Sequence, residues 1–273
     1  MIRGMYSAIS GLKQQQLALD VTANNLANVN TIGYKSSRAS FQDQLADTYS
    51  AGAAAGATTG GQNARQVGLG VALGGIQNQM GAGALQSTGN PLDVAINGEG
   101  YFRVQDAAGG APQYTRAGDF TPNDAGDIVT NDGYYVMNKP QAGNPNTGTH
   151  INIPAGASSV SVGPDGTVSY VPEDGSARTT AGVISLAKFP NEAGLTRSGG
   201  NRFQASASSG AETVGQPGSP AFGSTIGGTT EASNVDLASE FTNMITAQRG
   251  FQANSRVIST ADQMLQDLVN LKN

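Results

Sequence analysis

Residues 1–26 have the sequence MIRGMYSAISGLKQQQLALDVTANNL, in which apolar side chains recur every three or four positions. Positions three and four residues apart lie on one face of an α-helix. Four of the six apolar residues on this face are seven residues apart, which is typical of a helix that packs along another helix. We therefore predict an N-terminal helix with a packing seam formed by Ile2, Met5, Ile9, Leu12, Leu19 and Leu26.

The C-terminal end repeats this pattern. Its seam residues are Leu237, Phe241, Met244, Phe251, Ile258 and Leu265, and Ser233 is the expected N-cap, with Asp236 three residues further on as in a capping box. Small and polar residues dilute both seams, and helices gain most of their stability from packing. We therefore expect the two ends to pair with each other and with neighbouring subunits. The simpler alternative is that each helix packs on its own domain.

The middle of the chain predicts a β-domain. Between Leu92 and Phe203, short apolar runs alternate with turn sequences such as Asp132-Gly133 and Pro164-Asp165-Gly166. Close spacing without intervening helical segments favours antiparallel strands. Residues 51–90 contain 11 glycines and a single charged residue, which predicts a low-complexity connector, and residues 206–232 predict a return linker.

The expected fold class is therefore α+β, with paired N- and C-terminal helices forming a coiled-coil-like inner domain, a Gly-rich connector and a central antiparallel all-β domain. The expected boundaries are 1–30 for the first helix, 31–90 for the connector, 91–205 for the β-domain, 206–232 for the return linker and 233–273 for the second helix.

Composition excludes several function classes. The 273 residues include no Cys and no Trp, and His150 is the single histidine, so disulfide scaffolds, thiol catalysis and Cys/His zinc sites are excluded. A net charge of −5 counts against nucleic-acid binding, and no apolar run has the length of a membrane span. We expect no enzyme activity, no cofactor and no membrane insertion.

One carboxylate cluster was considered as a metal site. Asp119, Asp124, Asp127 and Asp132 lie within fourteen residues, but their spacing does not match a calcium-binding loop. Most of them flank Gly or Asn, so turn formation is the simpler interpretation. We therefore expect no metal site.

Three parts of the chain resemble the bacterial flagellar rod and hook proteins. Residues 23–35, ANNLANVNTIGYK, resemble the signature of that family; residues 248–255, QRGFQANS, resemble its C-terminal segment; and residues 97–102 and 114–120 resemble its central β-domain. The asparagines can cap the first helix, and glycine permits the following turn. The signature residues are Asn24, Asn25, Asn28, Thr31, Gly33, Tyr34 and Lys35.

The resemblance implies an axial structural protein of the flagellum, in the hook or the basal body and extracellular after export. Its terminal helices would form an inner tube and its β-domain an outer layer. The implied partners are further copies in a helical homopolymer, the neighbouring rod, hook-cap and hook–filament junction proteins, and the export apparatus that secretes the unfolded chain. Phe41 and Leu45 resemble an export-gate motif; one turn of an amphipathic helix is the alternative.

Within the family, the Gly250-Phe251-Gln252 sequence favours a short hook protein, the flexible tube that passes torque from rod to filament. The distal rod subunit of the basal body is the alternative, because 273 residues is nearer to rod length. A secreted β-domain binding module or adhesin is the competing function of another class, and it predicts a folded monomer with dispensable ends.

Overall fold

The computed structural model describes residues 2–54, 60–139, 150–157, 159–174 and 176–271. The chain forms two compact units. The helical unit consists of Met1–Ala27, Ser37–Asn78 and Asp236–Asn273, and the β-unit consists of Asn28–Ser36 and Gln79–Val235. Neither unit is a continuous piece of sequence, since the chain leaves and re-enters each of them.

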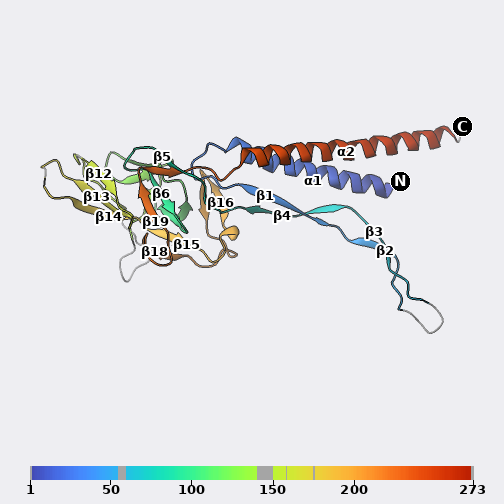
Figure 1. The fold of residues 1–273 in the computed structure, drawn as a ribbon, viewed down its shortest axis with the longest axis horizontal. Helices are drawn as coiled ribbons and strands as arrows, with labels where there is room; N and C mark the ends of the chain where they lie inside the picture. Colours follow the sequence, from blue (N-terminus) through green and yellow to red (C-terminus); the bar gives the residue numbers. More distant parts are fainter. Residues whose placement is uncertain (1, 55–59, 140–149, 158, 175, 272–273) are drawn as a thin grey trace. The chain divides into compact units, whose positions relative to one another are not determined.

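Two long helices dominate the helical unit. α1 (Ile2–Ala27) and α2 (Leu237–Asn270) lie side by side and antiparallel, so the N- and C-termini are at the same end of the pair (Figure 1). Their pairing confirms the expected α+β class. Neither helix is long and apolar enough to cross a membrane over the residues that are described.

The N-cap of α2 is Asp236, so the expectation of Ser233 at this position is wrong. The Asp236 carboxylate accepts hydrogen bonds from the backbone N–H groups of Ala238 and Ser239. Ser233 instead accepts a bond from the N–H of Val235, at 3.3 Å. The carboxylate satisfies two free N–H groups and carries a negative charge at the positive end of the helix dipole, which a serine hydroxyl does not.

A two-stranded ribbon completes the helical unit. β1 (Ser37–Asp43) pairs with β4 (Val71–Asn78), and β2 (Ala46–Ser50) pairs with β3 (Arg65–Gly68), both antiparallel (Figure 1). β1 and β4 also contact α1. Much of the expected connector is therefore extended and paired. Pairing between segments this far apart in sequence has no local sequence pattern that predicts it. The Gly- and Ala-rich composition also obscures the alternation of apolar and polar residues by which strands are recognised.

In its described residues, the β-unit contains a nine-stranded sheet and three smaller sheets. The order of the main path is β16-β17-β8-β7-β11-β10-β9, and β15 pairs with both β7 and β18. The strands of this sheet are β7 (Tyr101–Gln105), β8 (Gln113–Thr115), β9 (Phe120–Pro122), β10 (Ile128–Thr130), β11 (Tyr135–Val136), β15 (Leu186–Lys188), β16 (Thr196–Gly199), β17 (Arg202–Gln204) and β18 (Thr213–Gly215).

The smaller sheets come from both ends of the β-unit and from its middle. One has the order β12 (Ser159–Val162), β13 (Thr167–Val171), β14 (Thr179–Val183), and two are pairs: β6 (Val94–Asn97) with β19 (Ser224–Gly227), and β5 (Leu85–Ser87) with β20 (Thr229–Glu231). The short 3-10 helix η1 spans Glu192–Gly194. Strands β18, β19 and β20 lie within the expected return linker, so this segment is part of the folded unit.

Two strands at the centre of the β-unit are buried on both faces. Successive side chains of a strand point to opposite sides, and accordingly Phe102 and Leu186 belong to one apolar core whereas Tyr101 and Ala187 belong to another. The first core is mainly aliphatic, and the second is mainly aromatic. β7 and β15 therefore separate two cores, which fixes the orientation of every side chain along them.

Candidate functional site

The buried residues of the paired helices α1 and α2 are small or polar. The buried residues are Ala8, Thr22 and Asn25 on α1, and Ala247 and Ala261 on α2. They lie close to the rows of large apolar residues at seven-residue spacing, Met5 to Leu26 and Met244 to Leu265, which are partly buried. Small residues let the helix axes approach closely, and the larger residues flank the contact.

The expected seam residues have different surroundings. Met5, Ile9, Leu12, Leu19 and Leu26, together with Met244, Phe251, Ile258 and Leu265, are partly buried, whereas Leu237 and Phe241 are 44% and 50% exposed. The side chain of Ile2 lies outside the described part of the structure. The sequence analysis missed the small companion rows, Ala8-Gln15-Thr22 and Ala247-Asn254-Ala261. Their signal is a seven-residue repeat that begins three positions after each large row.

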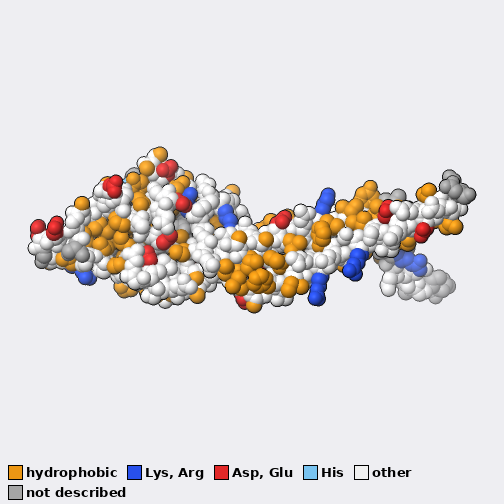
Figure 2. Space-filling model, turned by 90° about the horizontal axis from the view of Figure 1, so that it is seen from above, with side chains coloured by type: hydrophobic (Ala, Val, Ile, Leu, Met, Phe, Trp, Pro, Cys, Tyr) orange, Lys and Arg blue, Asp and Glu red, His pale blue; other side chains and the backbone are white. Residues whose placement is uncertain are grey.

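The helical unit leaves much of its apolar surface exposed. Figure 2 shows apolar side chains gathered at several places along it. An apolar groove of 380 Å³ is lined by residues of both helices, among them Met5, Val257 and Met264. Exposed apolar patches of this kind mark surfaces for contact with other molecules. The exposed large apolar side chains of α2 and its C-cap are Leu237, Phe241, Ile245, Val257, Met264, Leu268, Val269 and, at the cap, Leu271.

The signature residues of α1 and of the segment that follows make local hydrogen bonds. Asn25 is buried, and its amide both donates to the backbone oxygen of Ser37 at 2.8 Å and accepts from its N–H at 2.9 Å. The Asn28 carbonyl and side-chain oxygens accept bonds from the N–H and hydroxyl of Thr31, each at 3.2 Å. Asn24 is exposed on α1. The asparagines thus stabilise the turns at the end of the helix.

The rest of the signature is docked into the β-unit. Gly33 has a φ of +66°, donates its N–H to the backbone oxygen of Glu231 at 2.8 Å, and passes so close to Ala117 that a Cβ would lie 2.3 Å from its nitrogen. The buried ring of Tyr34 lies 4.9 Å from the Arg197 guanidinium carbon. Glycine is therefore required at residue 33 both by its backbone conformation and by the close approach.

A buried ion cluster holds the end of the signature. The Lys35 ammonium lies 2.5 Å from one Glu231 oxygen, and Arg116 lies 3.2 Å from the other. All three side chains are at most 4% exposed. Backbone groups complete the cluster, because Lys35 also donates to the oxygen of Gly81, and Glu231 accepts from the N–H of Gly83, both at 2.8 Å. The cluster joins segments that are far apart in sequence.

Burial lowers the pKa of Lys35, because desolvation disfavours the ammonium, while the Glu231 carboxylate opposes that effect. Each charge of the pair therefore has a buried counter-charge that offsets part of its desolvation. We call Lys35, Glu231 and Arg116 the signature lock. Glu231 was not found by sequence analysis, since its stretch resembles a linker. Arg116 lies in the 114–120 segment that carries part of the family resemblance.

Two buried tyrosines predict loss of stability at alkaline pH. Burial raises the pKa values of Tyr101 and Tyr114 well above the usual range, and hydrogen bonds to Glu192 and Glu212, at 2.8 and 2.7 Å, add to this. Unfolded tyrosine ionises near pH ~10. Above that pH the folded chain binds more protons than the unfolded chain, so the free energy of unfolding falls as pH rises.

Ultraviolet absorbance should therefore show these tyrosines ionising only as circular dichroism reports unfolding. Tyr101→Phe should make the pH dependence shallower. Ionisation of all eight tyrosines in the folded chain would contradict the prediction.

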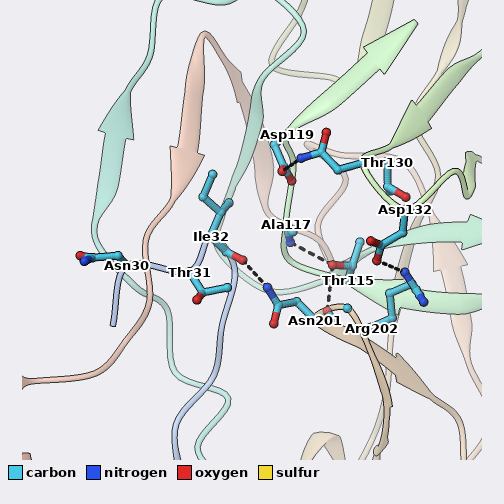
Figure 3. A pocket seen from close by; sticks show the side chains of 12 residues that line it. Asn30, Thr31, Ile32, Thr115, Ala117, Asp119, Thr130, Asp132, Asn201 and Arg202 are labelled. Carbon is cyan, nitrogen blue, oxygen red and sulfur yellow. Dashed lines mark hydrogen bonds and ion pairs between the residues drawn. The ribbon is translucent and has the colours of Figure 1, made fainter. Parts of the chain in front are cut away.

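A polar pocket of 310 Å³ lies beside the docked signature segment (Figure 3). The Asn201 amide donates to the backbone oxygen of Ile32 at 2.9 Å and so ties the signature to the pocket wall. Arg202 pairs with Asp132, and Asn131 donates to Asp119. Burial, followed by the nearby carboxylates, raises the pKa of Asp119. These polar groups partner one another across the pocket.

The remaining expected residues lie elsewhere. In the described residues, no group of three or more His, Cys, Asp or Glu side chains could hold a metal ion. His150 is exposed, and its ring centroid lies 4.2 Å from that of Tyr135. Phe41 lies in strand β1 opposite Leu73, and Leu45 follows that strand, so the alternative of a helical turn is wrong. Their exposed fractions are 40% and 85%.

Comparisons with known proteins identify the class to which this architecture belongs. Residues 5–35 match the flagella basal body rod protein family, residues 95–170 match the flagellar hook protein FlgE/F/G D1 domain, and residues 226–271 match the flagellar basal body rod FlgEFG protein C-terminal family. The chain belongs to the flagellar rod and hook protein family. It is an axial structural subunit and not an enzyme.

Individual relatives extend this match over the whole chain. The flagellar basal-body rod protein FlgG of Bacillus subtilis is 49% identical over 273 residues, covering 100% of both chains. The FlgG protein of Caulobacter vibrioides is 42% identical, covering 99% of this chain and 100% of its own. The flagellar hook protein FlgE of Borreliella burgdorferi is 27% identical over an alignment of 444 positions, which covers 100% of both chains.

Proposed function

We propose that this chain is the distal rod subunit of the flagellar basal body. The observation that carries the proposal is the similarity to rod relatives along the entire chain, which has one β-unit between its two terminal helices in sequence. The similarity to a hook protein is lower and is spread over a much longer alignment. We therefore prefer the distal rod subunit, which was the alternative in the sequence analysis, to the hook protein that the sequence favoured.

The Gly250-Phe251-Gln252 sequence, which favoured a hook protein, has a structural explanation that serves either protein. Gly250 lies directly beneath the side chain of Gln15 on the opposite helix. Helix packing within one subunit explains the glycine at this position. The glycine therefore does not distinguish a flexible tube from a stiff one. The motif therefore carries no weight in the choice between hook and rod.

In the proposed rod, the helical units of many copies form the inner tube and the β-units form the outer layer. Neighbouring copies cover the apolar side chains that a single copy leaves exposed on α2. The other partners are the adjoining axial proteins of rod and hook, including the cap and junction proteins, and the export apparatus. Phe41 and Leu45 remain the candidate contact with that apparatus. The subunit is located in the basal-body rod.

Electron microscopy of assemblies formed by the purified full-length chain tests the proposal. Straight, stiff tubes are expected. Ile258→Asp, which places a charge in the partly buried row of α2, should abolish them, whereas Ser255→Asp at an exposed position of the same helix should not.

Curved tubes would overturn the proposal in favour of the hook. Folded monomers under conditions in which related subunits polymerise would overturn it in favour of a binding module.

A further inference from the structure

The glycines of the two helices fall into two kinds. α1 contains Gly4 and Gly11, and α2 contains Gly250. A Cβ at Gly11 would lie 2.8 Å from Nδ2 of Asn254, and a Cβ at Gly250 would lie 2.9 Å from Cδ of Gln15. A Cβ at Gly4 would meet nothing within 4 Å. Two of the three glycines are therefore covered by an amide side chain of the opposite helix.

These two contacts are reciprocal. On α1 the glycine precedes the amide residue by four positions (Gly11 and Gln15), and on α2 it does the same (Gly250 and Asn254). Residues four apart lie on the same helix face, one turn from each other. Because the helices are antiparallel (Figure 1), the pattern brings each glycine opposite the amide residue of the other helix. We call these two contacts the glycine–amide interlock.

A shift of either helix by one turn destroys both contacts. In one direction Gly11 would come opposite Gly250, which leaves a gap between two residues without side chains. In the other direction Gln15 would come opposite Asn254, which crowds two amides into the space of one. Gaps and overpacking both destabilise a packed interface. The interlock thus favours one register over its nearest alternatives.

The register determines which residues of α2 extend past α1. Gly11 lies nine residues after the start of α1, and the residue nine positions after its partner Asn254 is Gln263. In the described part of the chain, α2 continues to Asn270, so its last two turns extend past the start of α1 at Ile2. Leu268 and Val269 in this overhang are 52% and 66% exposed. A register shift would change the length of the exposed apolar end.

We infer that the glycine–amide interlock is the register determinant of the terminal helix pair, and that it sets the length of the α2 overhang that contacts a second copy of this chain. The second half of the inference rests on the proposed function, since a polymer supplies that second copy. Gly11, Gln15, Gly250 and Asn254 are positioning residues for assembly. The overhang, residues 264–271, is the surface that they position.

Alanine substitutions in the full-length chain separate this role from helix propensity. Alanine is a better helix former than glycine, so propensity alone predicts that Gly4→Ala, Gly11→Ala and Gly250→Ala all stabilise their helices. α1 and α2 are the α-helices of the described residues, so the helical circular dichroism band reports on their unit. Gly4→Ala is expected to raise its melting midpoint. Gly11→Ala and Gly250→Ala are expected to raise it less than Gly4→Ala does, because the Asn254 or Gln15 amide must move aside, and to assemble at a higher critical concentration than Gly4→Ala.

Double variants identify the contact that is responsible. In an Asn254→Ala background, Gly11→Ala should raise the midpoint as much as Gly4→Ala does, because the amide that it displaces is absent; Gln15→Ala should restore the full gain of Gly250→Ala in the same way. The mismatched pair, Gly11→Ala with Gln15→Ala, should show no rescue. Non-additivity confined to the matched pairs supports the interlock.

Two results would overturn the inference: an equal increase in the midpoint for all three glycine variants, or additive effects in the matched pairs. The melting experiment does not depend on polymer formation. If the matched pairs are coupled but the unsubstituted chain forms no tubes, the interlock is supported and the proposed function is refuted.

Discussion

Glu231→Ala is expected to destabilise the β-unit by about 3–5 kcal/mol, because it leaves the buried charges of Lys35 and Arg116 without a counter-charge. Removing one partner of a buried pair costs far more than the pair contributes, since the remaining ions have lost their water and keep only hydrogen bonds to backbone carbonyls, at Gly81 and Gly98. The free energy of unfolding should be measured by denaturant titration. Tyrosine fluorescence is a suitable probe because the chain has no tryptophan.

The matched control is Glu99→Ala, which removes the partner of Lys188 at the surface, where the glutamate is 66% exposed. This variant should leave the stability almost unchanged. Replacing the whole lock with apolar residues (Lys35→Met, Arg116→Met and Glu231→Leu together) should recover much of the loss, because no buried charge then remains. Equal stability of Glu231→Ala and Glu99→Ala would show that the signature lock does not hold the segment.

Gly33→Ala is expected to cost about 2–4 kcal/mol through strain at positive φ combined with overpacking. The new Cβ would lie 2.3 Å from the nitrogen and 2.7 Å from the Cα of Ala117, and backbone atoms cannot turn aside as a side chain can. The docked segment would have to lift, which disrupts the hydrogen bond from Gly33 to Glu231. Thermal unfolding followed by near-ultraviolet circular dichroism measures the loss.

Gly89→Ala separates the two causes of that effect. Gly89 has a φ of +76°, similar to that of Gly33, but a Cβ there would meet nothing within 4 Å. Its replacement therefore reports the backbone strain alone, which is expected to be about 1 kcal/mol. If both variants lose the same stability, the close approach to Ala117 contributes nothing, and the steric part of the argument fails.

The sequence predicts the elements that have a local periodic pattern, above all the two helices. The seven-residue rows from Met5 and Met244 identify both helices, and the residues from Asn25 to Lys35 identify the segment between helix and β-unit. The cap at Asp236 was missed because a serine at 233 satisfies the same sequence rule. Such rules locate the start of a helix to within a turn, but the exact N-cap depends on which side chain reaches the free N–H groups.

Long-range partners could not be predicted in this way. Glu231 lies 196 positions after Lys35, and no local pattern joins them. One signal was nevertheless available. In residues 206–232 the charged residues are Glu212 and Glu231, and each is the partner of a buried arginine, Arg103 or Arg116. A carboxylate that stands alone in a Gly- and Ser-rich stretch merits attention as the partner of a buried cation.

The division of the chain between its two units also has a kinetic consequence. The path enters the helical unit three times and the β-unit twice. α1 therefore cannot pair until α2 is present, and Lys35 cannot pair until Glu231 is present. Nearly the whole chain is needed before either unit can fold. Contacts of such high contact order form slowly. A chain that leaves a narrow channel with its N-terminus first would remain unfolded until its last segment has emerged. The time at which it folds would then be set by the passage of the chain through the channel.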